Sequence, residues 1–265
     1  MGLFDNMKVM KIANKGYKLH SEGNKLFDAD KYEEGRKKHA EALKYYDEAY
    51  QMGVSNVNIL MAYGILLLRD GQFEKAKEVF LKVHYTPGLS PQYRFQLRIN
   101  YSVCLWKLGK IDEAISTIRR AAADSKTTSI YTTLGLFLIE KAEQTGDFEE
   151  AIAFNNEAYE YDDEDAVILD NMGQLHYVIS AALCRKGDSE KAAEEKKLAV
   201  EYFVRAHKIR PKQTTTLYYL GRLHHENGDD EKARPYLEKA LEGNFSCISP
   251  VSREMVEALL GELSK

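Results

Sequence analysis

The chain has few of the residues that mark secreted, disordered or membrane proteins. Only three cysteines occur among 265 residues, and no two form a CxxC pair, so neither a disulfide framework nor a thiolate zinc site is expected. Five prolines and the lack of any low-complexity run argue against disorder. No stretch approaches 18 consecutive apolar residues, so no membrane span is predicted. The amino terminus does not read as a secretory signal, and the expected location is cytoplasmic.

An excess of one charge is also lacking. The chain has 37 basic and 41 acidic side chains, a formal net charge of −4, and the two signs are mixed along the sequence. A nucleic-acid-binding protein needs a basic stripe that neutralises phosphates. We therefore expect no nucleic-acid partner.

Motifs for catalysis and cofactor binding are missing as well. The sequence has no P-loop, no GxSxG, no HExxH and no GxGxxG after a strand. His224, His225 and Glu226 form a cluster of metal-ligand types, but neighbouring residues on a helix point about 100° apart, and zinc needs several convergent ligands. We therefore expect a packed His224, a small buried thiol at Cys104, and a non-enzymatic chain with no metal and no cofactor.

Helical periodicity runs through nearly the whole chain. Apolar residues recur at three- and four-residue spacings, and the alternation typical of strands is rare. Short breaks pair a residue suited to a helix C-terminus with a polar start for the next helix. These breaks, which predict helix–turn–helix units, are 28–30, 70–71, 109–110, 146–147, 187–188 and 228–230.

The breaks belong to a recurring motif, which reads Leu60-x2-Tyr63-Gly64 and then Ala76-x3-Phe80 in one copy. A small residue in the first helix lets two antiparallel helices approach closely, and large residues one turn away fill the space beside it. In three copies, 12 residues separate this small residue from the first alanine of the second helix: Gly64 and Ala76, Ser102 and Ala114, Gly221 and Ala233.

This spacing resembles the tetratricopeptide repeat, a 34-residue helix–turn–helix with the pattern W-x2-L-G-x2-Y…A-x3-F…P. Six imperfect copies cover about nine-tenths of the chain; each replaces the leading Trp, and the fifth keeps the closing proline as Pro211. The resemblance implies an all-α fold, a right-handed α-solenoid of antiparallel hairpins forming a single domain over 1–265. Its repeats are predicted at about 9–54, 57–88, 95–126, 128–163, 166–211 and 214–245.

Two copies are longer than the others, because 26 residues separate Gly16 from Ala42 and Gly173 from Ala199. Residues 9–88 overlay 166–245 without a gap, at an offset of 157 residues. We hypothesise that a unit of one long and one standard hairpin was duplicated; convergence within a repeat family is the alternative. A capping helix is predicted at 249–263, with an apolar face made by Met255, Val256, Leu259 and Leu260.

The resemblance also implies a binding face, because the family holds protein segments mostly in a concave groove lined by the first helix of each repeat. Residues at such positions should face solvent, and exposed apolar patches mark binding sites. A tightly wound superhelix could instead bury them, or the amino-terminal helix could fill the groove. The predicted groove positions are Met61, Ile65, Leu68, Ile99, Val103, Trp106, Leu136 and Ile139, followed by the polar set Asp170, Gln174, Tyr177, Tyr218 and Arg222.

The function that this resemblance implies is a non-catalytic scaffold or adaptor. Its partner is expected to be a protein or peptide segment, helical and partly apolar, that lies in the groove with anchors at helical spacing. A peptide-sensing regulatory module acting through a partner protein is the alternative. The long hairpins of repeats one and five could also form contacts in a homo-oligomer.

Overall fold

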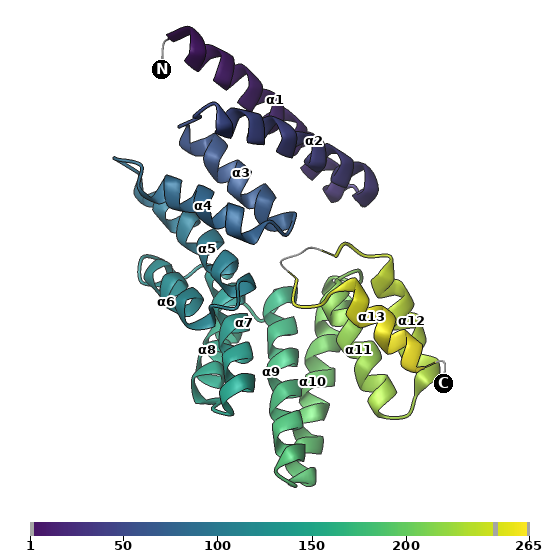
Figure 1. Cartoon of the computed structure of the whole chain (residues 1–265). Helices are drawn as coiled ribbons and strands as arrows, with labels where there is room; N and C mark the ends of the chain where they lie inside the picture. The colour runs from purple at the N-terminus through teal and green to yellow at the C-terminus, as the bar shows by residue number, and fades with distance from the viewer. Residues whose placement is uncertain (1–2, 246–248, 264–265) are drawn as a thin grey trace. The chain divides into compact units, whose positions relative to one another are not determined.

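The computed structural model describes residues 3–245 and 249–263 (Figure 1). Within these ranges the chain forms thirteen α-helices and no strand, which confirms the predicted all-α class. Every helix of the described ranges is too short or too polar to span a lipid bilayer. The chain divides into two compact units, Met1–Lys110 and Ile111–Lys265. This boundary falls inside the third predicted repeat, so the single solenoid over 1–265 stays a prediction.

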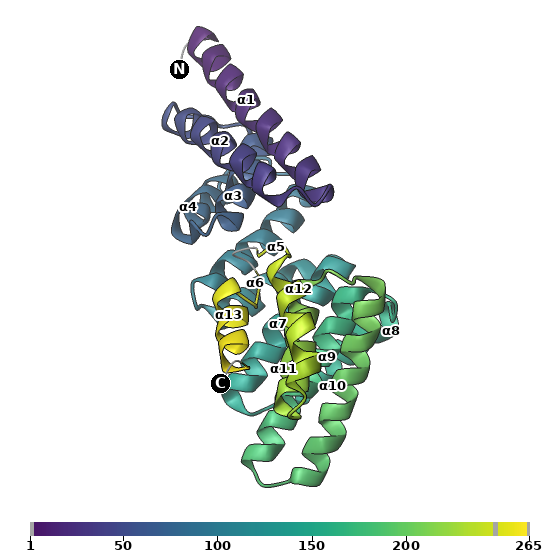
Figure 2. The ribbon, with the colours of Figure 1, turned by 90° about the vertical axis from the view of Figure 1, so that its right-hand side faces the viewer.

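Unit 1 contains α1 (Leu3–Asp28), α2 (Tyr32–Gln51), α3 (Val57–Arg69), α4 (Phe73–His84) and α5 (Pro91–Lys107). Unit 2 contains α6 (Ile111–Ala122), α7 (Thr128–Thr145), α8 (Glu149–Tyr161), α9 (Ala166–Arg185), α10 (Ser189–Ile209), α11 (Thr214–Glu226), α12 (Asp230–Leu241) and α13 (Arg253–Glu262). Within each unit, neighbouring helices pack as hairpins, as α1 with α2 and α9 with α10 in Figure 2. These two hairpins are the long ones, as the spacing predicts.

The six predicted breaks all separate helices, and each contains one residue with a left-handed backbone. Glycine adopts this conformation without the steric cost that a Cβ brings, and it occupies five of the six positions. Asp30 takes the sixth with a φ of 59°. The glycines are Gly71, Gly109, Gly146, Gly187 and Gly228, with φ between 74° and 82°.

The repeat glycine of the first helix lies where two helices touch. A Cβ added to Gly64 would lie 2.4 Å from Cε1 of Phe80, and one added to Gly173 would lie 2.8 Å from Cδ1 of Phe203. The same contact recurs between Gly16 and the ring of Tyr46, 157 residues before Gly173 and Phe203. The two long hairpins therefore share one packing register, as the duplication hypothesis requires.

The fourth repeat departs from this pattern, because Asn155 stands where the other copies have a large apolar residue. Its amide is buried and donates to the carbonyls of Ala151 at 2.9 Å and Gly135 at 3.3 Å. Asn171 of α9 donates to the carbonyl of Thr132 in α7 at 2.8 Å. Buried polar groups need such partners, so hydrogen bonds replace aromatic packing between these helices.

The capping helix is shorter than predicted, since α13 begins at Arg253, after the Ser252 N-cap, whose hydroxyl accepts from the amide of Met255. Val256 and Leu259 are buried against α11 and α12, and Leu260 packs at the edge of that cluster. The prediction was wrong for Met255, which is 38% exposed. Val251, just before the helix, is 1% exposed and belongs to that cluster instead.

Two histidines are buried between α1 and α2. The rings of His20 and His39 meet edge to face with centroids 5.2 Å apart, and Nδ1 of His20 lies 3.3 Å from the hydroxyl of Tyr46. His39 stacks on Phe27 at 4.9 Å, and its Nε2 is buried without a hydrogen-bond partner. Burial, followed by the nearby His39 and Arg69, lowers the pKa of His20 to about 4.

Acid should therefore loosen the α1–α2 hairpin. Because the folded-state pKa of His20 is lowered, its stabilising contribution is full above about pH 6.5 and is lost as the pH falls through about 4, at a cost of about 3 kcal/mol. Hydrogen exchange of α1 and α2 should accelerate over this interval and do so less in His20→Phe. Equal acid responses of the two proteins would contradict this prediction.

Candidate functional site

The predicted apolar groove positions of unit 1 fall into two groups. Ile65, Ile99 and Val103 are half-buried and keep part of their surface in solvent. The expected exposure was wrong for Met61, Leu68 and Trp106, which are 6%, 3% and 8% exposed. Eight of the 13 residues of α3 are buried, as expected for a helix that is apolar all round. The Nζ of Lys107 lies 4.0 Å from the Trp106 ring centroid and covers it.

In unit 2 the predicted groove positions are also partly closed. Ile139 is 2% exposed, contrary to expectation, because it packs among the buried residues of α7, whereas Leu136 is half-buried. Asp170, Gln174 and Tyr218 are buried, and Tyr177 and Arg222 are half-buried. Neighbouring helices thus cover much of the surface that the repeat register assigns to a groove. Whether these residues bind a partner stays a prediction.

Asp170 of α9 is buried beside the first turn of α11. Its carboxylate accepts from the Thr216 hydroxyl and from Nε2 of Gln174, the latter at 2.8 Å, and also from the side chain of Gln213. Burial raises the pKa of Asp170 to about 6, although these three hydrogen bonds favour the charged form. The residue therefore joins α9 to α11 rather than offering a free carboxylate.

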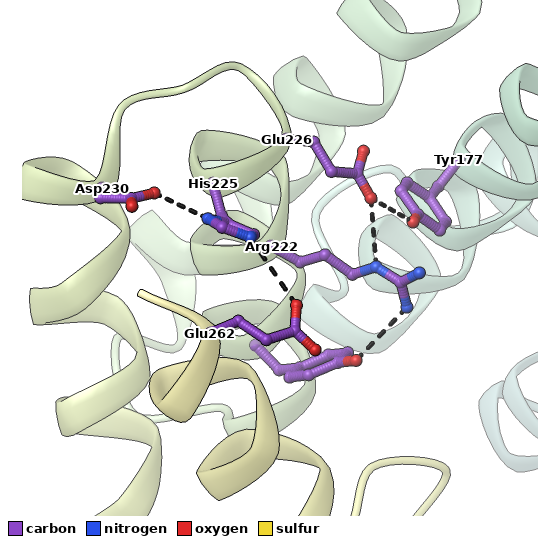
Figure 3. A network of polar contacts seen from close by, with 7 residues as sticks. Tyr177, Arg222, His225, Glu226, Asp230 and Glu262 are labelled. Atoms are coloured by element: carbon purple, nitrogen blue, oxygen red, sulfur yellow. Dashed lines mark hydrogen bonds and ion pairs between the residues drawn. The ribbon is translucent and has the colours of Figure 1, made fainter. Parts of the chain in front are cut away.

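Tyr177 and Arg222 meet at one carboxylate, that of Glu226 (Figure 3). Oε1 of Glu226 accepts from the Tyr177 hydroxyl at 2.6 Å and from Nε of Arg222 at 3.1 Å, while Nζ of Lys196 lies 3.1 Å from Oε2. The guanidinium carbon of Arg222 is 5.2 Å from the Tyr177 ring centroid, a cation–π distance. Its Nη1 donates to the Tyr218 hydroxyl at 3.3 Å.

This geometry fixes Arg222 in one orientation on α11. Burial alone would raise the pKa of Glu226, but the hydrogen bonds from Tyr177 and Lys196 bring it below its ordinary value. The carboxylate therefore stays charged and holds the guanidinium beside two tyrosines. Arg222 is still 40% exposed, so its remaining N–H groups can reach an acceptor on a partner.

His224 and His225, which precede Glu226 on α11, make their contacts outside this network. His224 stacks on Tyr236 with centroids 5.6 Å apart, which confirms that it is a packed residue. Nδ1 of His225 lies 2.7 Å from Oδ1 of Asp230, and its Nε2 lies 3.7 Å from Oε2 of Glu262 in α13. Figure 3 shows His225 facing Asp230 and Glu262 rather than Glu226.

Cys104 behaves as the small buried thiol that its position predicts. It is 0% exposed and donates to the carbonyl of Phe73 at 3.1 Å. Burial raises the pKa of the thiol to about 11, so the nucleophilic thiolate is scarce at neutral pH.

Sequence reasoning missed Lys196 and Glu262 and did not assign Glu226 to the site. Arg222 and Glu226 are four residues apart on one helix, a spacing that favours an ion pair and could have drawn attention to Glu226. Lys196 and Glu262 come from α10 and α13, and no local spacing connects them to Arg222.

Comparisons with known proteins address the fold. The family model described as tetratricopeptide repeat matches residues 26–90 and 182–246, two segments whose separation nearly equals the 157-residue offset. A comparison with curated proteins gives no match.

Among solved structures, human IFIT1, in a dimer with PPP-AAAA, is 16% identical with a TM-score of 0.60 over 84% of this chain. The match covers 49% of IFIT1, so the chain spans about half its length. YrrB, a TPR protein with an unusual peptide-binding site, is 19% identical with a TM-score of 0.45, covering 76% of this chain and 89% of YrrB. MamA from MSR-1 is 18% identical with a TM-score of 0.41, covering 70% and 95%. Such identities concern the fold alone.

The pKa of Asp170 leads to a testable pH dependence of unit 2. Because its folded-state pKa is raised, the carboxyl stabilises the fold most below about pH 4, and this contribution of about 3 kcal/mol is lost as the pH rises through about 6. Relative to Asp170→Asn, the wild-type free energy of unfolding should therefore increase on acidification.

Denaturant unfolding near neutral pH and near pH 4.5, read by hydrogen exchange of α9 and α11, measures this difference. Asp163→Asn, a change at an exposed carboxylate, is the control. If the free energy of unfolding changed equally with pH in wild type and in Asp170→Asn, the raised pKa of the buried Asp170 carboxyl would be ruled out.

Proposed function

The chain belongs to the tetratricopeptide repeat family, whose helical solenoid is a protein–protein interaction scaffold, and we propose that it binds an amphipathic, partly apolar peptide segment. The surface assigned to the partner is the set of half-buried apolar positions on α3 and α5. We call it the apolar face of unit 1, and it comprises Ile65, Ile99 and Val103.

The observation that supports this proposal is the contrast within α3 and α5. Met61, Leu68 and Trp106 are buried and need no partner, whereas Ile65, Ile99 and Val103 keep apolar surface in water at the positions where the family contacts its ligands. Apolar surface left in contact with water favours association. The buried side chains of Met61, Leu68 and Trp106 pack in the interior of the same two helices.

The partner's chemistry follows from the side chains available. Branched aliphatic residues offer no hydrogen bonds, so they select apolar side chains, which a helical segment presents along one face at three- and four-residue spacing. In unit 2, taken by itself, we assign a polar contact to Arg222, which is 40% exposed at a predicted groove position, and an aromatic contact to the half-buried ring of Tyr177. Leu136, also half-buried, is assigned an apolar contact there.

A protein segment fits these positions better than a phosphate-bearing ligand such as the PPP-AAAA named in the IFIT1 structure. Binding a phosphate backbone requires several cations, and Arg222 is the single cation among the predicted groove positions. Glu226 already neutralises it at 3.1 Å. We therefore assign the chain a protein partner.

The proposal is tested by placing a charge on the apolar face of unit 1. The double variant Ile65→Glu, Val103→Glu should weaken binding of a partner at least about tenfold, since each carboxylate must lose water to contact apolar side chains. Quantitative affinity capture from the native host identifies the partner, and titration of its synthetic segment then gives the dissociation constants.

The matched control is Ile152→Glu, Ile209→Glu, which changes two exposed apolar residues of the second helices α8 and α10. Circular dichroism should show that both double variants keep wild-type helix content. A partner that binds wild type and the Ile65, Val103 variant equally would refute the assignment of this face.

A further inference from the structure

The hairpin of α1 and α2 presents two rows of opposite charge on exposed positions. Lys11, Lys18 and Lys25 follow one another at seven-residue spacing along α1, and Glu34, Glu41 and Glu48 do the same along α2. Seven residues are about 20° short of two full turns, so each triplet stays on one side of its helix. All six residues are exposed.

The residues 157 positions further on, in the α9–α10 hairpin, show what the corresponding side of that hairpin contacts. Ile168 and Asn171, the counterparts of Lys11 and Asn14, contact α7 and α8 through the cluster with Tyr131 and through the hydrogen bond to Thr132. Arg205, the counterpart of Glu48, donates from Nη1 to the Tyr159 hydroxyl of α8 at 2.7 Å. In α9 and α10 this side therefore stacks on another hairpin.

The two rows share one face of the hairpin and run side by side. Gly16 lies against Ala42, and Gly23 against the carbonyl of Gly35, which places Lys18 level with Glu41. By the same antiparallel register, Lys11 is level with Glu48 and Lys25 with Glu34. Figures 1 and 2 both show α1 and α2 lying side by side.

Such a face is complementary to itself in one orientation. A two-fold axis parallel to the helices would place α1 of one copy over α2 of the other while keeping the height along the helix. Each lysine would then face the level glutamate of the other copy. A two-fold axis across the helices would place lysine over lysine, so only the first arrangement is favoured.

Contacts within the hairpin leave most of these charges available. Lys18 is 4.0 Å from Glu22, and Glu22 is bound more closely by Lys38 at 2.9 Å. Among the residues that the structure describes, no ion pair joins the lysine row to the glutamate row within one chain. The side that stacks on another hairpin in α9 and α10 is thus charged and uncovered in α1 and α2.

We propose that this charged face of α1 and α2 binds the same face of a second copy of the chain, forming a two-fold symmetric dimer. Symmetric dimers use one self-complementary patch on both subunits. Individual exposed ion pairs are weak, so the dimer should form at high protein concentration and low salt. This inference does not depend on the proposed peptide-binding face, which uses α3 and α5.

Sedimentation velocity of the full chain over a range of concentrations tests the proposal. The wild type should pass from monomer to dimer as concentration rises, and the dimer should dissociate in about 1 M salt, where the screening length is about 3 Å. Lys11→Glu, Lys18→Glu, Lys25→Glu makes all six positions of the two rows acidic, and Glu34→Lys, Glu41→Lys, Glu48→Lys makes all six basic; the bridge between Glu22 and Lys38, which lies between the rows, stays in both variants. Each variant alone should stay monomeric, and an equimolar mixture should form a one-to-one dimer.

The control variant is Lys186→Glu, Lys197→Glu, Lys208→Glu, which changes three exposed lysines of the α9–α10 hairpin and alters net charge equally. It should dimerise as the wild type does. A wild type that is monomeric at every concentration, a dimer unaffected by either triple variant, or a mixture that fails to associate would each overturn the proposal.

Discussion

The close approach of two helices at a small residue is the constraint on which the rest of the structure depends. At Gly64 and Gly173 even a single added carbon would overlap the aromatic ring of the facing helix. The hairpins that contain these two glycines therefore tolerate no larger residue there without moving apart, and interiors packed as densely as organic crystals transmit such a shift. Because each contact fixes the relative height of two helices, it also decides which side chains share a face, including those of the predicted groove.

The parts of the fold that depend on local spacing were predictable from the sequence. The turns at Gly71, Gly187 and Asp30 follow from residues that accept or tolerate a left-handed backbone. The length of the α9–α10 hairpin follows from the 26 residues between Gly173 and Ala199. Both features are set by residues near one another in the chain, so a single sequence contains the information.

The site was less predictable, because exposure depends on residues from several helices. Repeat register assigned Met61 and Ile139 to a solvent-facing groove, yet both are buried by their neighbours. The same register could not reveal that Lys196 of α10 and Tyr177 of α9 meet Glu226. A register gives the direction of a side chain from its own helix. It does not give the size or charge of what the next hairpin places opposite.

The 157-residue offset separates what the backbone sets from what the side chains add. Tyr177, Lys196 and Glu226 form an ionic network in unit 2, and their counterparts in unit 1 are His20, His39 and Arg69. There the histidines are buried and lie close enough to Arg69 for its charge to lower both pKa values. One helical arrangement thus holds a carboxylate between cations in one half of the chain and neutral imidazoles beside a guanidinium in the other. Because glycine contacts preserve the arrangement in both hairpins, these positions differ in charge without any change of fold.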